Sequence, residues 1–253
     1  MLLKEINTSD SKETSIMAPR LQVTDLSVSL VRQPDNLLLK NVSLALHAGE
    51  IYALVGESGS GKSITSLSIM RLLPDALTIT SGNVLLKGKS LFHLTEQDMS
   101  AVRGSKVAMI FQDALTSLNP VKKIGHQITE TLKIHTRLQG RGLQERAIEL
   151  LAEVGIPDPE KRLDCYPHQM SGGQQQRVMI AIALACNPDV LLADEPTTAL
   201  DVTIQKQILK LLKNQQPTPI LPPKMLMKPP PQLKKIQMLL RNLRLVKRLK
   251  KRN

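Results

Sequence analysis

A glycine-rich segment early in the chain has the composition and spacing of a phosphate-binding loop. Residues 56–63 fit the pattern G-x-x-x-x-G-K-[ST], with an apolar run before them and a helix-forming sequence after them. Glycines let successive backbone N–H groups turn toward a triphosphate at a helix N-terminus, where the helix dipole also favours anions. Lys62 would reach the β- and γ-phosphates, and the Ser63 hydroxyl would ligate Mg²⁺. The predicted nucleotide-binding residues are Gly56, Glu57, Ser58, Gly59, Ser60, Gly61, Lys62, Ser63 and Ile64.

Two adjacent carboxylates follow a second apolar run. Asp194 and Glu195 come directly after residues 190–193, which read as a buried strand. Open α/β sheets bind their ligands at the carboxyl ends of such strands. Asp194 would hold Mg²⁺, directly or through water, and Glu195 would polarise the water that attacks the γ-phosphate. Taken alone, the pair is equally consistent with a solvated strand end.

A second phosphate-binding position is predicted where Ser171 precedes an apolar helix. The residues are Ser171, Gly172, Gly173 and Gln174, and serine is a favoured N-cap. The simplest interpretation is a helix cap, but the N–H groups of such a helix end also bind phosphate. The helical sequence before this segment is expected to place it too far from the phosphate loop of its own chain to bind the same phosphates. A symmetric dimer would let each chain complete the site of the other.

Strands that alternate with helices must position these residues, which indicates an α/β fold. Strands at 21–31 and 37–46 are expected to be antiparallel and joined by a turn at 33–36, and the continuous apolar run 51–55 is expected to be buried on both faces. Periodicity further predicts strands at 84–86, 107–111 and 189–193, and helices at 62–73, within 124–164, at 171–185 and at 201–213. The region from about 120 to 187 reads as an all-helical insert.

Composition excludes several classes of protein. The 253 residues include only two phenylalanines and two tyrosines, so a base-stacking platform for single-stranded nucleic acid is not expected. Two cysteines do not make a disulfide framework, which favours a reducing compartment. The longest apolar run, 178–186, has nine residues, whereas a membrane helix needs about 20. The polar N-terminus does not resemble a secretory signal.

The net charge of +12 belongs to one end of the chain. Residues 1–213 contain 23 basic and 22 acidic residues, whereas residues 214–253 contain eleven basic residues and no acidic one. We divide the chain into a leader at 1–20, a domain at 21–213 and a basic, proline-rich tail at 214–253. Three interpretations of the tail compete. It could lie on an anionic membrane surface as an amphipathic helix, or it could contact nucleic-acid phosphates. It could also be an accidental ending that follows a loss of the reading frame. Its composition favours the last interpretation.

These motifs, in this order, resemble the ATP-binding subunits of ABC transporters. Residues 56–63 resemble the family's Walker A motif, and Gln112 its Q-loop glutamine, which would contact Mg²⁺. Ser171 to Gln174 resemble the signature motif, which binds the ATP of the partner subunit. Asp194 and Glu195 resemble the Walker B motif with its catalytic glutamate, and Asp201 resembles the aspartate of the D-loop. The sequences at 111–120, 166–169 and 193–201 resemble those of the ATPases of dipeptide and oligopeptide importers. Microcin C-type and nickel importers share these sequences.

The resemblance implies a P-loop NTPase core with an antiparallel β subdomain and a helical insert. It further implies an ATPase with ATP and Mg²⁺ as cofactors, which pairs with a second ATP-binding subunit, as a homodimer or heterodimer. Such subunits dock on transmembrane permease subunits at the cytoplasmic face of the membrane and serve a solute-binding protein indirectly. Nucleic acid is not an expected partner.

One departure from the family affects the expected activity. The switch histidine and the strand that carries it would fall near Lys228, and the sequence has no histidine after His168. Seven prolines between 217 and 231 are incompatible with a central strand. We therefore expect this part of the core to be missing and hydrolysis to be weak. The alternatives are a binding-only remnant and a soluble ABC ATPase that acts on nucleic acid or ribosomes.

Overall fold

The structure is a computed structural model that describes residues 18–57, 59–112 and 114–194. Predictions that concern the leader, the helix at 201–213 and the tail lie outside these residues. Within the described residues, no helix is both long and apolar enough to cross a membrane.

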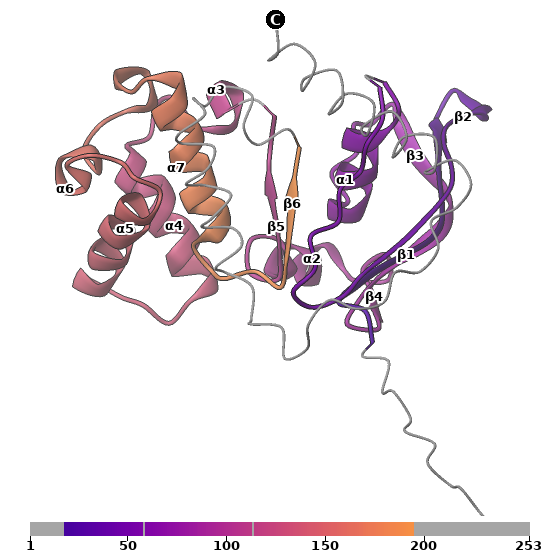
Figure 1. Cartoon of the computed structure of the whole chain (residues 1–253), viewed down its shortest axis with the longest axis horizontal. Helices are drawn as coiled ribbons and strands as arrows, with labels where there is room; N and C mark the ends of the chain where they lie inside the picture. Colours follow the sequence, from indigo (N-terminus) through magenta and orange to yellow (C-terminus); the bar gives the residue numbers. More distant parts are fainter. Residues whose placement is uncertain (1–17, 58, 113, 195–253) are drawn as a thin grey trace, which may run out of the picture. The chain divides into compact units, whose positions relative to one another are not determined.

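An antiparallel sheet forms the first part of the fold (Figure 1). Its strands are β1 (Leu21–Leu30), β2 (Gln33–Leu46), β3 (Leu77–Leu86) and β4 (Lys89–Ser90), in the order β2-β1-β3-β4. The predicted turn at 33–36 is wrong, because Leu30 already pairs with Gln33 and the chain reverses at residues 31–32. β2 is an edge strand, and an edge strand tolerates Pro34, which has no N–H to donate to a neighbour.

A β-bulge changes the buried face of β1 half-way along the strand. Thr24 pairs with Asn83 and Ser27 with Ser81, so Asp25 and Leu26 together face Gly82. The side chains of Leu21 and Val23 are buried before the bulge, and those of Leu26 and Val28 after it. Ser43 fixes the bulge, because its Oγ accepts a hydrogen bond from the Asp25 N–H at 2.8 Å and donates one to the Asp25 carboxylate at 3.1 Å.

A parallel pair of strands joins two buried cores. β5 (Val107–Ile110) pairs with β6 (Val190–Ala193) in the register Val107 to Val190 and Ile110 to Ala193. Ala108 and Ile110 belong to the core of the helical insert, whereas Val107 and Met109 belong to the core shared by the antiparallel sheet and α1 (Lys62–Met70). β5 is therefore buried on both faces, as its apolar sequence predicts.

The expected strand at 51–55 is not formed. Residues 51–57 are irregular, and Ile51, Tyr52, Leu54 and Val55 are 65%, 53%, 42% and 78% exposed. A continuous apolar run becomes a buried strand only where neighbouring strands take up its backbone hydrogen bonds. In the part of the chain that the structure describes, β5 and β6 pair with each other, and no strand pairs with this segment.

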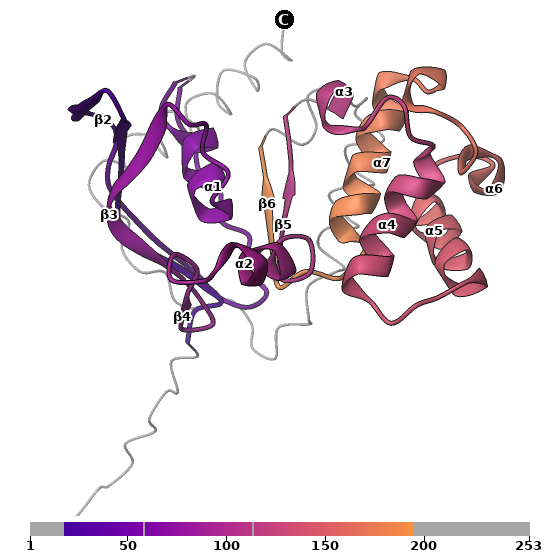
Figure 2. The ribbon, with the colours of Figure 1, turned by 180° about the vertical axis from the view of Figure 1, so that it is seen from behind.

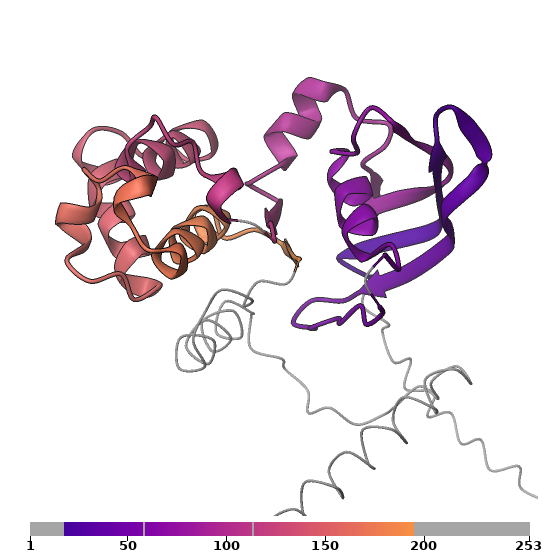
Figure 3. The same ribbon diagram turned by 90° about the horizontal axis from the view of Figure 1, so that it is seen from above.

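The predicted helical insert is correct. It consists of α3 (Ala114–Ser117), α4 (Ile124–His135), α5 (Arg141–Glu153), α6 (Pro159–Arg162), the 3₁₀ turn η1 (Pro167–Gln169) and α7 (Gly172–Leu184). Figures 2 and 3 show α4, α5 and α7 grouped together, and their buried residues form one cluster that includes Ile128, Leu151 and Ile180. Outside the insert, α1 ends three residues earlier than predicted, and α2 (Glu96–Val102) was not predicted.

Candidate functional site

The glycine-rich loop leads directly into α1. Gly61 is the N-cap of this helix and has a φ of 89°, in the left-handed region that favours glycine. A β-carbon at Gly61 would lie 2.3 Å from Cδ2 of Leu39, a side chain that is 4% exposed. A side chain at position 61 would therefore require the buried Leu39 side chain to move.

Lys62 turns back over the loop that precedes it. Its Nζ donates to the carbonyl oxygens of Gly56 and Glu57, both at 2.8 Å, and lies 3.4 Å from the Ser60 hydroxyl oxygen. The first helical hydrogen bond runs from the Thr65 N–H to the Gly61 carbonyl at 2.9 Å, so the N–H groups of residues 62–64 have no helical carbonyl to which they can donate. A cationic side chain and three such N–H groups form a suitable cradle for an anion.

The parallel strand pair brings Gln112 and Asp194 to the same edge. β5 and β6 end opposite each other, and the Asp194 N–H donates to the Ile110 carbonyl at 3.0 Å. Gln112 follows two residues after Ile110 and is exposed. Ser63, the third predicted Mg²⁺ ligand, lies in the first turn of α1. A carboxylate, an amide and a hydroxyl oxygen are the kinds of ligand that Mg²⁺ takes. Glu195, Asp201 and Ser58 lie outside the described residues.

The predicted N-cap at Ser171 is confirmed as a reciprocal capping box. The Ser171 Oγ accepts a hydrogen bond from the Gln174 N–H at 3.3 Å, and the Gln174 Oε1 accepts one from the Ser171 N–H at 3.1 Å. Apart from its chain neighbours and the backbone of its own helix, no atom of the described residues lies within 4 Å of the position that a β-carbon at Gly172 would take, so this helix end is open among them. These contacts fix the start of α7 and leave its first turn accessible.

Gln175 is a positioning residue that the sequence analysis missed. It is 6% exposed, and its Nε2 donates to the carbonyl oxygens of Pro167 and Met170 at 2.9 and 3.0 Å. These bonds tie the turn before Ser171 to the first turn of α7. A glutamine among the buried positions of an apolar helix was the available signal, because a buried amide must be hydrogen-bonded.

A stability measurement tests the cap. We expect Ser171→Ala to lower the free energy of unfolding by about 1 kcal/mol, because the Gln174 N–H loses its acceptor. Urea unfolding followed by circular dichroism measures this change. Ser171→Asp keeps an acceptor and is expected to restore most of the loss. Equal stability of the alanine variant and the wild type would show that the capping box contributes nothing.

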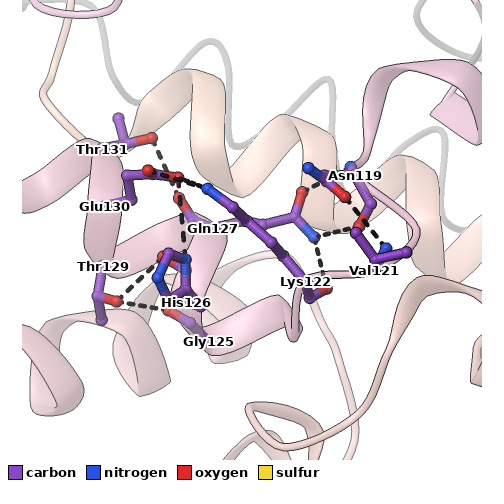
Figure 4. Close-up of polar contacts among 9 residues, drawn as sticks. All are labelled: Asn119, Val121, Lys122, Gly125, His126, Gln127, Thr129, Glu130 and Thr131. Carbon is purple, nitrogen blue, oxygen red and sulfur yellow. Dashed lines mark hydrogen bonds and ion pairs between the residues drawn. The ribbon is translucent and has the colours of Figure 1, made fainter.

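Gln127 of α4 organises the loop between α3 and α4 (Figure 4). Its Oε1 accepts from the Asn119 N–H at 2.9 Å, and its Nε2 donates to the carbonyls of Asn119 and Lys122 at 3.0 and 2.9 Å. Lys122 Nζ in turn lies 3.1 Å from both carboxylate oxygens of Glu130. The loop before α4 is therefore held in one conformation by a single amide of that helix, a contact that was not predicted.

Comparison with known sequences identifies one family. The family model described as "ABC transporter" matches residues 39–198. The oligopeptide transport ATP-binding protein OppD of Bacillus subtilis is 52% identical over 198 residues, which are 78% of this chain and 55% of that protein. The peptidoglycan transport ATP-binding protein YejF of Agrobacterium fabrum is 53% identical over 79% of this chain and 37% of its own length. A probable peptide ABC transporter ATP-binding protein of Sinorhizobium fredii is 55% identical over 69% of this chain and 52% of its own length.

Comparison with solved structures also finds ATP-binding cassettes of ABC proteins. The dimeric post-hydrolysis state of the ATP-binding cassette MJ0796, bound to ADP and Pi, has a TM-score of 0.67 and 31% sequence identity, and the match covers 76% of this chain and 81% of that one. A bacterial Atm1-family ABC exporter with ATP bound has a TM-score of 0.63 at 25% identity, over 79% of this chain and 33% of that one. The chain thus has the α/β fold of ATP-binding cassettes, and it spans about half the length of the curated relatives, or less.

Proposed function

Because the chain belongs to the ABC transporter family, we propose that it binds Mg·ATP and energises the import of peptides across a membrane. The observation that carries the proposal is the loop at 56–63, where Lys62 and the first N–H groups of α1 converge. The peptide specificity is supported by relatives named as peptide and oligopeptide transport ATP-binding proteins at 52–55% identity.

The proposed mechanism relies on positioning and charge rather than on a covalent intermediate. Lys62 leaves the carbonyls of Gly56 and Glu57 and donates to phosphate oxygens, and the N–H groups at the start of α1 hold the same phosphates. Ser63, Gln112 and Asp194 would hold Mg²⁺, which would supply positive charge against the charge that develops on the phosphates. Glu195 orients the attacking water.

The proposed site is completed by a second chain. Ser171 and the first turn of α7 bind the γ-phosphate held by the partner subunit, and the dimer closes when ATP binds. The dimeric cassette at 31% identity supports this arrangement. The proposed partners are a second ATP-binding subunit and transmembrane permease subunits at the cytoplasmic face of the membrane.

A second candidate function is ATP binding without efficient turnover. Two observations favour it. The segment 51–55, which leads into the phosphate loop, is exposed and unpaired among the described residues, and a lysine stands at position 228, near which the family resemblance places the switch histidine. In this case the chain would occupy an ATP site without driving repeated cycles of transport.

Turnover by the purified chain distinguishes the two functions. If the chain is an active ATPase, we expect Glu195→Gln to lower the rate of phosphate release by at least a hundredfold and to leave nucleotide affinity within about threefold, because water activation is lost while the phosphate loop is intact. Phosphate release and binding of a fluorescent ATP analogue measure the two quantities. A wild-type chain that binds the analogue but releases no more phosphate than Glu195→Gln would support the second function. A wild-type chain without binding would refute both.

A further inference from the structure

The C-terminal end of α1, the helix that begins at the phosphate loop, is contacted by Arg103, which follows α2. α1 has nine residues and is therefore about 13 Å long. Arg71 follows it with a φ of 53°, and the Leu72 N–H closes the helix end by donating to the Leu67 carbonyl at 2.9 Å. The next carbonyls, of Met70 and Arg71, accept hydrogen bonds from Arg103 Nε at 2.9 Å and Arg103 Nη2 at 3.3 Å.

Arg103 is itself held in place. Its side chain is 18% exposed, and its Nη1 donates to the carboxylate of Glu96 in the first turn of α2. The hydrogen bond from Arg103 is the main reason that the pKa of Glu96 lies below its usual value. Arg71 supports the same cluster, because its Nη1 donates to the carbonyls of Leu91 and Leu94 at 3.2 and 2.7 Å.

The backbone of Arg103 leads into the strand that precedes Gln112. Arg103 forms a parallel bridge with Val107, the first residue of β5, and the Gly104 N–H donates to the Val107 carbonyl at 2.9 Å. Arg103 therefore contacts the far end of α1 through its guanidinium and the start of β5 through its backbone. This polar link joins the helix that begins with Lys62 to the strand that precedes Gln112, beside the apolar contacts that the two elements share.

We propose that Arg103 is a positioning residue for nucleotide binding: it fixes the C-terminal end of α1 against β5 and thereby sets the direction of the N–H groups at the other end of the helix. A helix of nine residues has little stability of its own, so its direction depends on such contacts. A cation at the C-terminal end also complements the helix dipole. The inference rests on the proposed ATP binding.

The geometry requires arginine rather than any cation. Three separate nitrogens of the guanidinium donate, to two carbonyls and one carboxylate. The ammonium group of lysine is a single point and does not reproduce this planar fork. We therefore expect lysine to keep the charge near the helix end but to hold the helix less firmly.

Nucleotide affinity of folded variants tests the proposal. Dissociation constants for a fluorescent ATP analogue with Mg²⁺ are measured well below each melting temperature, together with hydrogen exchange at residues 65–70, whose N–H groups donate within α1. We expect Arg103→Gln to weaken binding at least tenfold and Arg103→Lys to weaken it three- to tenfold, with faster exchange at 65–70 in both. The matched control is Arg146→Gln: Arg146 is 24% exposed and pairs with Glu149 and Glu153 on α5, so its loss is expected to leave affinity unchanged.

The outcomes separate this proposal from the proposed function. If Arg103→Gln melts earlier but binds as the wild type does, Arg103 only stabilises the fold and the proposal is wrong. If Arg103→Gln does not fold, Arg103→Lys decides, and an affinity within twofold of the wild type overturns the proposal. If the wild type does not bind while its circular dichroism spectrum shows a folded chain, the proposed function itself fails, and this inference fails with it.

Discussion

Replacement of Lys62 by alanine is expected to weaken ATP binding by a hundredfold or more. Its Nζ makes 2.8 Å hydrogen bonds to the carbonyls of Gly56 and Glu57, so the ammonium group already lies over the loop that would hold the phosphates. A hydrogen bond to a charged group contributes about 1.5–3 kcal/mol, and each 1.4 kcal/mol corresponds to about a factor of ten in affinity. The loss of two such bonds to phosphate accounts for the expected effect.

Titration with a fluorescent ATP analogue measures this change. Lys133→Ala is a suitable control, because Lys133 is an exposed lysine on α4 and its removal changes the net charge equally. We expect the control to bind as the wild type does. If both variants lose the same affinity, the effect of Lys62 reflects only net charge, and its assignment to the phosphates is wrong.

Replacement of Gly82 by alanine is expected to lower the free energy of unfolding by about 3 kcal/mol. Gly82 has a φ of 93°, and a β-carbon there would lie 2.6 Å from the Asp25 carbonyl oxygen and from the N and Cα atoms of Leu26. A left-handed conformation costs a non-glycine residue about 1–2 kcal/mol, and displacing packed atoms costs a further 1–3 kcal/mol or so. The obstructing atoms belong to the backbone of β1, which cannot turn aside as a side chain would.

Gly88 offers a matched control for this effect. It has a φ of 78°, but in the described part of the chain no atom beyond its two neighbours lies within 4 Å of the position that a β-carbon would take. Gly88→Ala therefore reports the conformational cost alone, about 1 kcal/mol. Urea unfolding of the two variants separates the cost of the contact with β1 from that of the backbone angle. Equal losses at the two positions would show that the close approach at Gly82 relaxes freely.

The sequence predicted those parts of the site that depend on neighbouring residues. The helix starts after the glycine-rich loop and after Ser171 are local patterns, in which glycine and serine suit the N-cap position. Arg103, Gln127 and Gln175 were missed because they bind backbone carbonyls, which every residue possesses. A contact of this kind leaves no complementary residue type to find in the sequence.

The fold likewise contains features with a local sequence signal and features that depend on distant parts of the chain. The bulge in β1 was not predicted, but it leaves a local signal. The apolar residues Leu21 and Val23 are followed by Leu26 and Val28, whereas strict alternation would place an apolar residue at position 25. In contrast, the apolar run 51–55 was wrongly predicted as a buried strand. Its composition suits such a strand, but strand formation depends on partners elsewhere in the chain, and among the described residues it has none.

The pairing of β5 with β6 also has a consequence for the order of folding. Val107 pairs with Val190, and the whole helical insert lies between them in the chain. The cost of closing a loop grows with its length, whereas helices form from nearby contacts and form quickly. Because Ala108 and Ile110 are buried in the core of the helices, β5 is expected to take its place when the insert folds and then to act as the template for β6. Folding of the helical insert thus shortens the loop that must close before β5 and β6 can pair.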